Sequence, residues 1–170
     1  MSATATEASE QVQADSEDAA LFVIDSREQR PYRLEPSKVA ALPTGDYSIA
    51  GFEDRIAVER KTKADLYVCI GRERQRFERE LERLAGFDFA AIVIECSLPD
   101  FLRPPAPSLV HPRAAIGSLL SWAVRHGVHA IFAGDRRHGA AVTKKILEKA
   151  RKYIIEKGEE GKECDESGPK

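Results

Sequence analysis

Residues 45–72 read GDYSIAGFEDRIAVERKTKADLYVCIGR, and the clearest signals of secondary structure in the chain lie here. The tripeptide Thr-Gly-Asp at 44–46 is a turn signal that leads into YSIAGF. The run RIAVERK at 55–61 then alternates apolar and polar side chains, as a half-buried strand does. We therefore predict a β-hairpin between residues 46 and 61.

Two helices are predicted directly after the hairpin. Thr62 followed by Asp65 is a capping pattern, with Asp in place of the more usual Glu, and the apolar run LYVCI after it stops at Gly71. A second helix is predicted from residue 73 to about residue 85, because Gly86 ends its pattern of apolar positions.

The flanking segments supply the rest of the predicted elements. LFVID at 21–25 is a compact β-rich run, and Pro31 and Pro36 mark an irregular segment before a short helix predicted to start at Ser37. The later elements are the buried strand FAAIVIE at 89–95, the proline-rich loop SLPDFLRPPAPS at 97–108, a helix over Arg113–His126, the strand VHAIFA at 128–133 and a closing helix at 139–157.

Strands that alternate with helices predict an α/β fold built around a mixed sheet, in one domain over residues 21–157. Residues 1–20 and 158–170 are polar and acidic, and we predict a flexible acidic tail at each end. The net charge of −2 hides this division, since residues 21–157 hold 24 bases and 18 acids. This surplus of positive charge favours an anionic partner.

Several classes of protein are excluded by composition. No apolar run approaches the roughly 20 residues that span a bilayer, and the first 20 residues lack the pattern of a signal peptide. We expect no membrane partner and a cytoplasmic location, at the nucleoid or in the nucleus if the host is compartmentalised. Three widely spaced cysteines without a CxxC motif indicate neither a disulfide framework nor a zinc site, and Cys69 and Cys96 are predicted to be buried.

The predicted hairpin brings together three residues with catalytic chemistry. Asp46 comes near the strand that holds Glu59, and strand alternation places Glu59 and Lys61 on the same face. Two carboxylates suit a hard divalent cation, and the lysine can orient or deprotonate a water and balance phosphate charge. The alternative for each acid is a solvated strand edge or a turn cap. The combination, with Asp25 and Glu28 at the end of the first strand, favours a metal site for phosphodiester hydrolysis.

The motifs of this stretch resemble those of the XPF-type family of structure-specific DNA endonucleases. The family pattern is GD, a spacer, then ERK, three residues and D, and the chain carries it as Gly45-Asp46, Glu59-Arg60-Lys61 and Asp65. Asp25-Ser-Arg27-Glu28 resembles its D-x-R-E motif, and Gly71-Arg72 its following G-R. The resemblance covers about residues 21–133 and implies a restriction-endonuclease-like fold.

The resemblance also implies residue roles and a cofactor. Asp46 and Glu59 would be ligands of Mg²⁺ or Mn²⁺, with the carbonyl of Arg60 as a third ligand, and Lys61 would be the catalytic lysine. Asp25 and Asp65 would assist the metal or hold Arg60 and Lys61 in place, although Asp65 is equally explained as a helix cap. The residues expected to line the site are Arg27, Glu28 and Arg72, with the arginines on phosphate oxygens.

The second predicted helix carries a row of arginines at spacings of three and four residues, namely Arg72, Arg76, Arg79 and Arg83. Such a row forms one stripe that could contact a DNA backbone. Interleaved glutamates make a solvated, salt-bridged helix an equal alternative for Arg79 and Arg83, so Arg72 and Arg76 are the stronger DNA-binding candidates. Glu95 is interpreted as a solvated strand end, and Trp122 as a core or subunit-interface residue. The basic cluster from Arg136 to Lys145 is left between a second DNA surface and an ordinary basic helix.

We therefore expect a metal-dependent endonuclease that cleaves branched DNA, such as a flap, a fork or another junction of single and double strands. Relatives commonly carry a tandem helix-hairpin-helix module, for which the 37 residues after position 133 have no room. This favours a homodimer or a separate DNA-binding partner chain, and a compact stand-alone nuclease also fits. The alternatives are a catalytically silent scaffold of the same fold and a sequence-specific restriction-type endonuclease.

Overall fold

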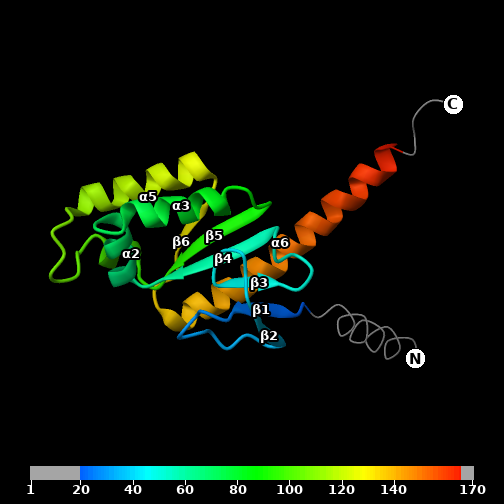
Figure 1. Ribbon diagram of the computed structural model, residues 1–170, viewed down its shortest axis with the longest axis horizontal. Helices are drawn as coiled ribbons and strands as arrows, with labels where there is room; N and C mark the ends of the chain where they lie inside the picture. Colours follow the sequence, from blue (N-terminus) through cyan, green and yellow to red (C-terminus); the bar gives the residue numbers. More distant parts are fainter. Residues whose placement is uncertain (1–19, 166–170) are drawn as a thin grey trace, which may run out of the picture.

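The computed structural model describes residues 20–165, with the side chains of residues 20–158. Its centre is a six-stranded sheet in the order β2-β1-β3-β4-β5-β6 (Figure 1). The β1–β3 and β3–β4 pairs are antiparallel, and the other neighbours are parallel, so the sheet is mixed as expected. The strands are β1 (Phe22–Asp25), β2 (Ser37–Ala40), β3 (Tyr47–Ile49), β4 (Ile56–Lys61), β5 (Phe89–Ile94) and β6 (His129–Phe132).

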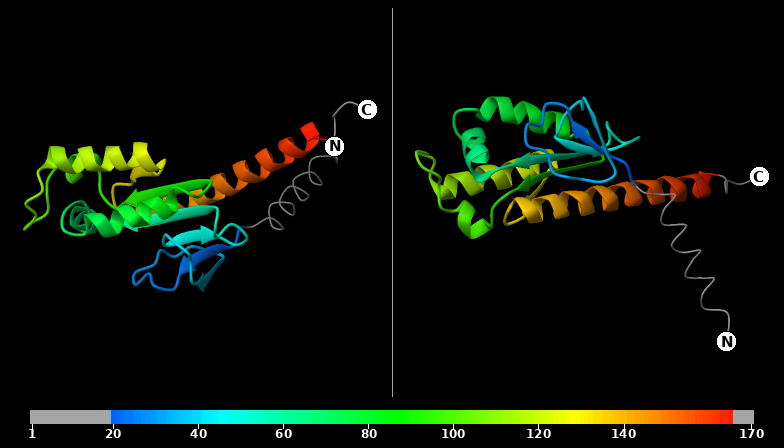
Figure 2. Two further views of the ribbon diagram at one scale, coloured as in Figure 1. Left: turned by 45° about the horizontal axis from the view of Figure 1, so that its top comes forward. Right: turned by 90° about the horizontal axis from the view of Figure 1, so that it is seen from below.

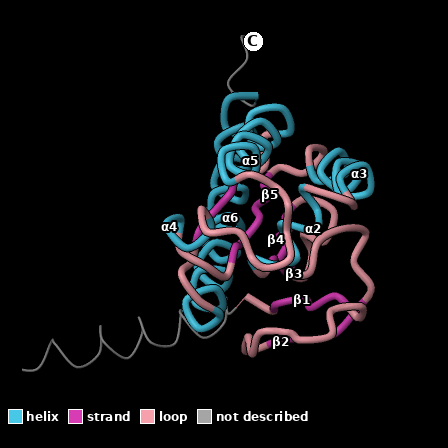
Figure 3. The backbone as a smooth tube through the Cα atoms, turned by 90° about the vertical axis from the view of Figure 1, so that its left-hand side faces the viewer, coloured by secondary structure: helices cyan, strands magenta, loops and turns pink. Residues whose placement is uncertain are grey.

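Helices cover both faces of this sheet, which gives three layers (Figures 2 and 3). One face carries α2 (Lys63–Ile70), α3 (Arg74–Leu84), the short α4 (Leu98–Phe101) and α5 (Pro112–His126). The other face carries only α6 (Arg136–Asp165) among the described helices, and its carboxyl end projects beyond the sheet (Figure 1). The predicted α/β class is confirmed.

Strand alternation divides the core between these two faces. Ala57 of β4 and Ile92 of β5 pack against α2, α3 and α5, whereas Val58 and Val93 pack on the α6 side. Because consecutive side chains point to opposite faces, the central strands must be apolar at nearly every position. Trp122 is fully buried in the first of these clusters, which confirms its interpretation as a core residue.

The predicted hairpin is confirmed, and Gly45 explains how the chain enters it. Tyr47 pairs with Val58 across the two antiparallel strands. Gly45 has φ +77°, and a Cβ there would lie 3.2 Å from the Ala57 side chain and 3.3 Å from the Val58 carbonyl oxygen. Both the left-handed conformation and the close strand therefore favour glycine directly before Asp46.

The predicted helix at Ser37 is wrong, because Ser37–Ala40 is strand β2. It pairs in parallel with β1, from Phe22 with Ser37 to Asp25 with Ala40. Four residues form too short a segment to be stable as an isolated helix, whereas the open edge of β1 offers a row of backbone partners. A strand partner that is distant in sequence thus overrides the local pattern.

Other differences concern the ends of elements. The proline-rich loop at 97–108 contains the four-residue α4. Helix α6 starts three residues before the predicted position 139 and continues to Asp165, so the predicted tail at 158–170 begins as helix. Residues 1–19, predicted as a tail, and residues 166–170 lie outside the described residues. Within the described part of the chain, no helix is both long enough and apolar enough to cross a membrane.

Candidate active site

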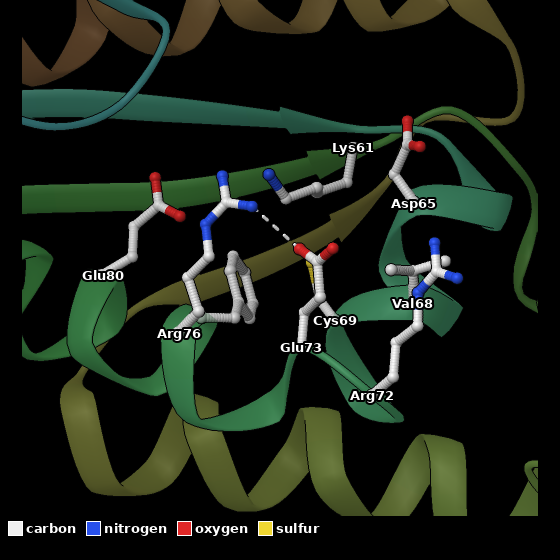
Figure 4. A pocket seen from close by; sticks show the side chains of 9 residues that line it. Lys61, Asp65, Val68, Cys69, Arg72, Glu73, Arg76 and Glu80 are labelled. Atoms are coloured by element: carbon white, nitrogen blue, oxygen red, sulfur yellow. Dashed lines mark hydrogen bonds and ion pairs between the residues drawn. The ribbon is translucent and has the colours of Figure 1, made fainter.

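The carboxyl end of β4 presents Glu59 and Lys61 toward the α3 face of the sheet. Glu59 is 3% exposed, and the Lys61 ammonium donates a hydrogen bond to its carboxylate. Lys61 reaches into the space bounded by α2 and α3, where Glu80 and Arg76 also project from α3 (Figure 4). The predicted common face of Glu59 and Lys61 is therefore confirmed.

Asp46 reaches the same place from the turn before β3. Its backbone N–H donates to the Val58 carbonyl, at 2.9 Å, and its Oδ2 accepts the backbone N–H of Arg60, at 2.8 Å. These two bonds hold Asp46 beside the end of β4. Asp46, Glu59 and Lys61 then line a cleft of about 300 Å³, together with Asp25, Arg27, Pro43, Thr44, Gly45, Arg76, Glu80 and Arg83.

The backbone of Arg60 also faces this cleft. In an extended strand, the N–H and C=O of one residue point to the same edge. Since the Arg60 N–H donates to Asp46, its carbonyl points to the edge of β4 that Asp46 occupies. Asp46, Glu59 and the Arg60 carbonyl thus provide oxygen atoms at one corner of the hairpin.

The two carboxyl groups are costly to ionise together in this site. Burial raises the pKa of Asp46 to about 6; the Arg60 N–H and the charge of Lys61 oppose this rise, and nearby acids add to it. Burial also raises the pKa of Glu59 well above its usual value, against the charge of Lys61 and with that of Asp46. A divalent cation would relieve this cost, so the donor set fits one.

The Lys61 ammonium supplies a positive charge beside the carboxylates of the cleft. Burial lowers its pKa, but the charges of Glu59 and Glu80 outweigh that effect and raise the pKa above its usual value. An ammonium in this position can balance the negative charge of a phosphate. Among the side chains that the structure describes, those of residues 20–158, no three of His, Cys, Asp or Glu form a metal-binding group. A cation held by Asp46 and Glu59 would take its other ligands from the Arg60 carbonyl and from water.

Comparison with known proteins gives the family of this chain. The family model of the ERCC4 domain matches residues 24–146. The chain belongs to the ERCC4 domain family. No curated protein matches the chain.

Two solved structures share the fold of this ERCC4 domain. XPF from Aeropyrum pernix superposes with a TM-score of 0.61 at 20% identity, over 82% of this chain and 69% of that one. XPF from the same organism in complex with DNA gives a TM-score of 0.55 at 21% identity, over 81% of this chain and 66% of that one. The ERCC4 domain therefore has the predicted restriction-endonuclease-like fold.

Asp25 of the ERCC4 domain lies at the rim of the cleft and is paired with Arg27. The Arg27 guanidinium donates two bonds of 2.8 Å to it, and the Leu42 N–H donates a third at 2.8 Å. The hydrogen bond from Arg27 is the largest cause that lowers the pKa of Asp25 to about 2. Asp25 thus holds Arg27, whereas the sequence predicted that it would assist the metal or hold Arg60 and Lys61. Its role beside a metal stays a prediction.

Asp65 takes part in the cap of α2, whose N-cap residue is Thr62. The hydroxyl of Thr62 accepts the Asp65 N–H at 3.2 Å, and the Asp65 carboxylate accepts a bond from that hydroxyl at 2.7 Å. Asp65 also lines the pocket next to Lys61 that continues to Arg72 (Figure 4). The geometry shows the cap, and a role of Asp65 in catalysis stays a prediction.

The arginine row divides along the helix. Arg76 and Arg83 line the cleft, and Arg72 lines the adjoining pocket with Arg76. Ion pairs were the alternative for Arg79 and Arg83, but the structure shows Arg76 paired with Glu73, at 2.9 Å, and places Arg83 in the cleft. A DNA-binding role for Arg27, Arg72 and Arg76 therefore stays a prediction, although all three lie on the walls of the cleft or its neighbour.

Two acidic residues of the ERCC4 domain were missed by the sequence analysis. Glu80, assigned there to surface ion pairs, lies in the cleft. Glu95, interpreted as a solvated strand end, is buried and paired with Arg60. Glu28 also pairs with Arg60, at 3.5 Å, and both residues line a pocket that adjoins the cleft and shares Asp46, Glu59 and Lys61 with it. The helical spacing of Glu80 from Arg76, at i and i+4, was the one local signal for its position.

Proposed function

We propose that this ERCC4 domain is a Mg²⁺- or Mn²⁺-dependent endonuclease that hydrolyses phosphodiester bonds in branched DNA. The observation that carries the proposal is the meeting of Asp46, Glu59 and Lys61 in one cleft, next to the backbone of Arg60. Two acids, a lysine and a divalent cation form a set suited to phosphodiester hydrolysis. The complex of XPF from Aeropyrum pernix with DNA supports the choice of polymer.

The residues act as follows in this mechanism. Asp46, Glu59 and the Arg60 carbonyl would hold the metal, which polarises the phosphate and lowers the pKa of a bound water. The Lys61 ammonium stabilises the charge that builds on the non-bridging oxygens as water attacks in line. The water oxygen forms a bond to phosphorus and gives its proton to solvent, the bond from phosphorus to the leaving oxygen breaks, and the leaving oxygen takes a proton from solvent to form a hydroxyl. Arg76 and Arg83 on the cleft wall contact neighbouring phosphates.

A cleavage panel tests the proposal. Purified chain with Mg²⁺ or Mn²⁺ is given labelled flap, fork, single-stranded and plain duplex DNA, beside the Asp46→Ala variant. We expect cleavage of the branched substrates by the wild type and loss of that cleavage in the variant. Equal cleavage by Asp46→Ala, or no cleavage of any branched substrate by the wild type, would contradict the proposal.

The same panel separates the two rival functions. A restriction-type enzyme would cut plain duplex at defined positions without preferring junctions. A silent scaffold would bind DNA and cut nothing. The intact set of Asp46, Glu59 and Lys61 favours catalysis over the scaffold.

We also propose that a second chain takes part, either as a homodimer or as a separate DNA-binding partner. Helix α5 exposes Leu120 and Val124, which are 57% and 85% accessible, on the side away from the core. Such side chains suit a protein contact. Sedimentation of the wild type and of Val124→Glu tests the homodimer, since dissociation only in the variant supports it. A wild type that sediments as a monomer at all concentrations leaves the separate partner chain as the proposal.

A further inference from the structure

A part-buried cluster of charges lies next to the cleft, on the α6 side of the sheet. The even-numbered side chains of β4 face α6, as Ile56 and Val58 do, and Arg60 continues that row. The Arg60 side chain therefore leaves β4 on the face opposite to Glu59 and Lys61, and Arg60 lines a pocket that adjoins the cleft. Nothing in the proposed mechanism uses this side chain directly.

Glu95 holds that guanidinium from the end of β5. The Arg60 Nε donates to Glu95 Oε1 at 2.8 Å, and Nη2 donates to Oε2 at 3.1 Å. The two side chains are only 9% and 8% exposed. A bidentate arginine–carboxylate pair of this kind fixes the orientation of the guanidinium as well as its position.

Arg136 at the start of α6 completes the cluster. Its Nη1 donates to the same Glu95 oxygen at 3.3 Å, and its Nη2 donates to the carbonyls of Arg30 and Pro31, both at 2.8 Å. The guanidinium carbons of Arg60 and Arg136 lie 5.7 and 5.1 Å from the centre of the Tyr32 ring. The cluster thus joins β4, β5, α6 and the segment that follows β1.

A buried ion cluster is weak evidence for stability, because removing charges from water opposes their attraction. What this one does fix is the orientation of Arg60, whose N–H binds Asp46 and whose carbonyl faces the same edge. Side chains behind metal ligands commonly set ligand geometry in this way.

We propose that Glu95 and Arg136 are positioning residues, which hold Arg60 so that its backbone keeps Asp46 and the Arg60 carbonyl in place for a divalent cation. This inference rests on the proposed function only in assuming that the cleft binds such a cation. It assigns the first turn of α6, on the far face of the sheet, a role in the cleft.

Titration of the full-length chain with Mn²⁺ tests the proposal without needing catalysis. Electron paramagnetic resonance of free Mn²⁺ gives the dissociation constant for the wild type, Glu95→Gln and Arg136→Gln. We expect Glu95→Gln to weaken Mn²⁺ binding about 10-fold or more, which is the usual size of an effect behind a metal ligand. Arg136→Gln should weaken it less, because Arg136 is 39% exposed and makes one of the three bonds to Glu95.

The matched control breaks another ion pair of the same strand region. Arg55, directly before β4, pairs with Asp88 at 2.5 Å, and both side chains are 48% exposed. Arg55→Gln should leave Mn²⁺ binding unchanged. The double variant of Glu95 and Arg136 should bind Mn²⁺ no more weakly than Glu95→Gln alone, because both act through Arg60.

Circular dichroism and thermal unfolding first establish that each variant is folded at the temperature of the titration. Arg136→Gln, on a partly exposed helix position, serves if Glu95→Gln does not fold.

Unchanged Mn²⁺ affinity in the folded variants, or an equal loss in Arg55→Gln, overturns the proposal, as does a wild type that binds no Mn²⁺. If the wild type binds Mn²⁺ and cleaves no DNA, the proposed function fails while the titration still decides the positioning role. If the wild type cleaves DNA, the Glu95 and Arg136 variants should show a lower kcat and an unchanged KM.

Discussion

The backbone N–H of Arg60 donates to the carboxylate of Asp46, 14 residues earlier in the chain, at 2.8 Å. This bond closes the hairpin corner and points one carboxylate oxygen at β4. The other oxygen of Asp46 remains for a ligand, next to Glu59 and Lys61.

Asp46→Asn keeps an oxygen that can accept the Arg60 N–H but removes the charge. We expect cleavage of branched DNA to fall by at least about 100-fold, because residues behind a metal ligand already cost about 10- to 100-fold. The free energy of unfolding at pH 7.5 should change little or rise, since one of several crowded buried charges is gone. Single-turnover cleavage and urea unfolding measure the two effects. Asp88→Asn, a change at an exposed acid, should alter neither, and a variant that stays fully active contradicts the assignment.

Divalent cations should stabilise the folded chain. A cation between Asp46 and Glu59 binds only the native state, so Mn²⁺ at about 100 times its dissociation constant should add about 2.7 kcal/mol to the free energy of unfolding. Differential scanning fluorimetry with Mn²⁺, and then with excess EDTA, measures the rise in Tm and its reversal. The rise should be absent in Asp46→Asn. An equal rise in that variant would place the cation elsewhere.

The Asp25–Arg27 pair predicts a loss of stability in acid. The pKa of Asp25 is lowered to about 2 in the folded chain, from 3.8, so the folded state favours the carboxylate. The stability it contributes is therefore present above about pH 4 and is lost as the pH falls through 2. We expect at most about 2 kcal/mol, because Arg27 is largely exposed. Asp25→Asn should destabilise the chain at pH 7 by more than at pH 2, and chemical unfolding at both pH values checks this. An equal loss at the two values would contradict the pair.

Gly139 predicts an exception to helix propensity. Alanine usually stabilises a helix by about 1 kcal/mol over glycine. A Cβ at Gly139, however, would lie 2.4 Å from the Tyr32 hydroxyl oxygen, and the Tyr32 ring is stacked on Tyr47 with 5.1 Å between centroids. Since the ring has little room to move, we expect Gly139→Ala to lower the free energy of unfolding by about 1–3 kcal/mol. Gly158→Ala, where a Cβ meets nothing, is the control in the same helix, and a stabilised Gly139→Ala would refute the argument.

The hairpin corner was predictable because its signals are local. Glu59 and Lys61 share a face through strand alternation, Asp46 joins them through a short hairpin, and Thr62 caps the next helix within three residues. Each of these relationships depends on the geometry of a few consecutive residues. The ERK motif adds the identity of the family, which the match to the ERCC4 domain confirms.

The residues that were missed depend on pairing between distant segments. Ser37–Ala40 became a strand because β1 offered an open edge, and nothing within those four residues indicates that partner. The sequence around Glu95 indicates a solvated strand end. In the structure, Arg60 at the end of β4 and Arg136 at the start of α6 both donate hydrogen bonds to it. Glu80 belongs to the cleft because α3 packs against this face of the sheet.

Local patterns predicted most of the elements, the hairpin corner and the acids and lysine on it, because hydrogen bonding and side-chain alternation over short spans leave few other arrangements. Which charges are buried and which partners they have depends on the packing of distant segments. The cost of removing a charge from water depends on every segment packed around it, and those segments are far apart in the chain. Arg60 illustrates the difference. Its backbone bonds Asp46 at the hairpin corner that the sequence predicted, whereas the pairing of its side chain with Glu95 appears only in the folded structure.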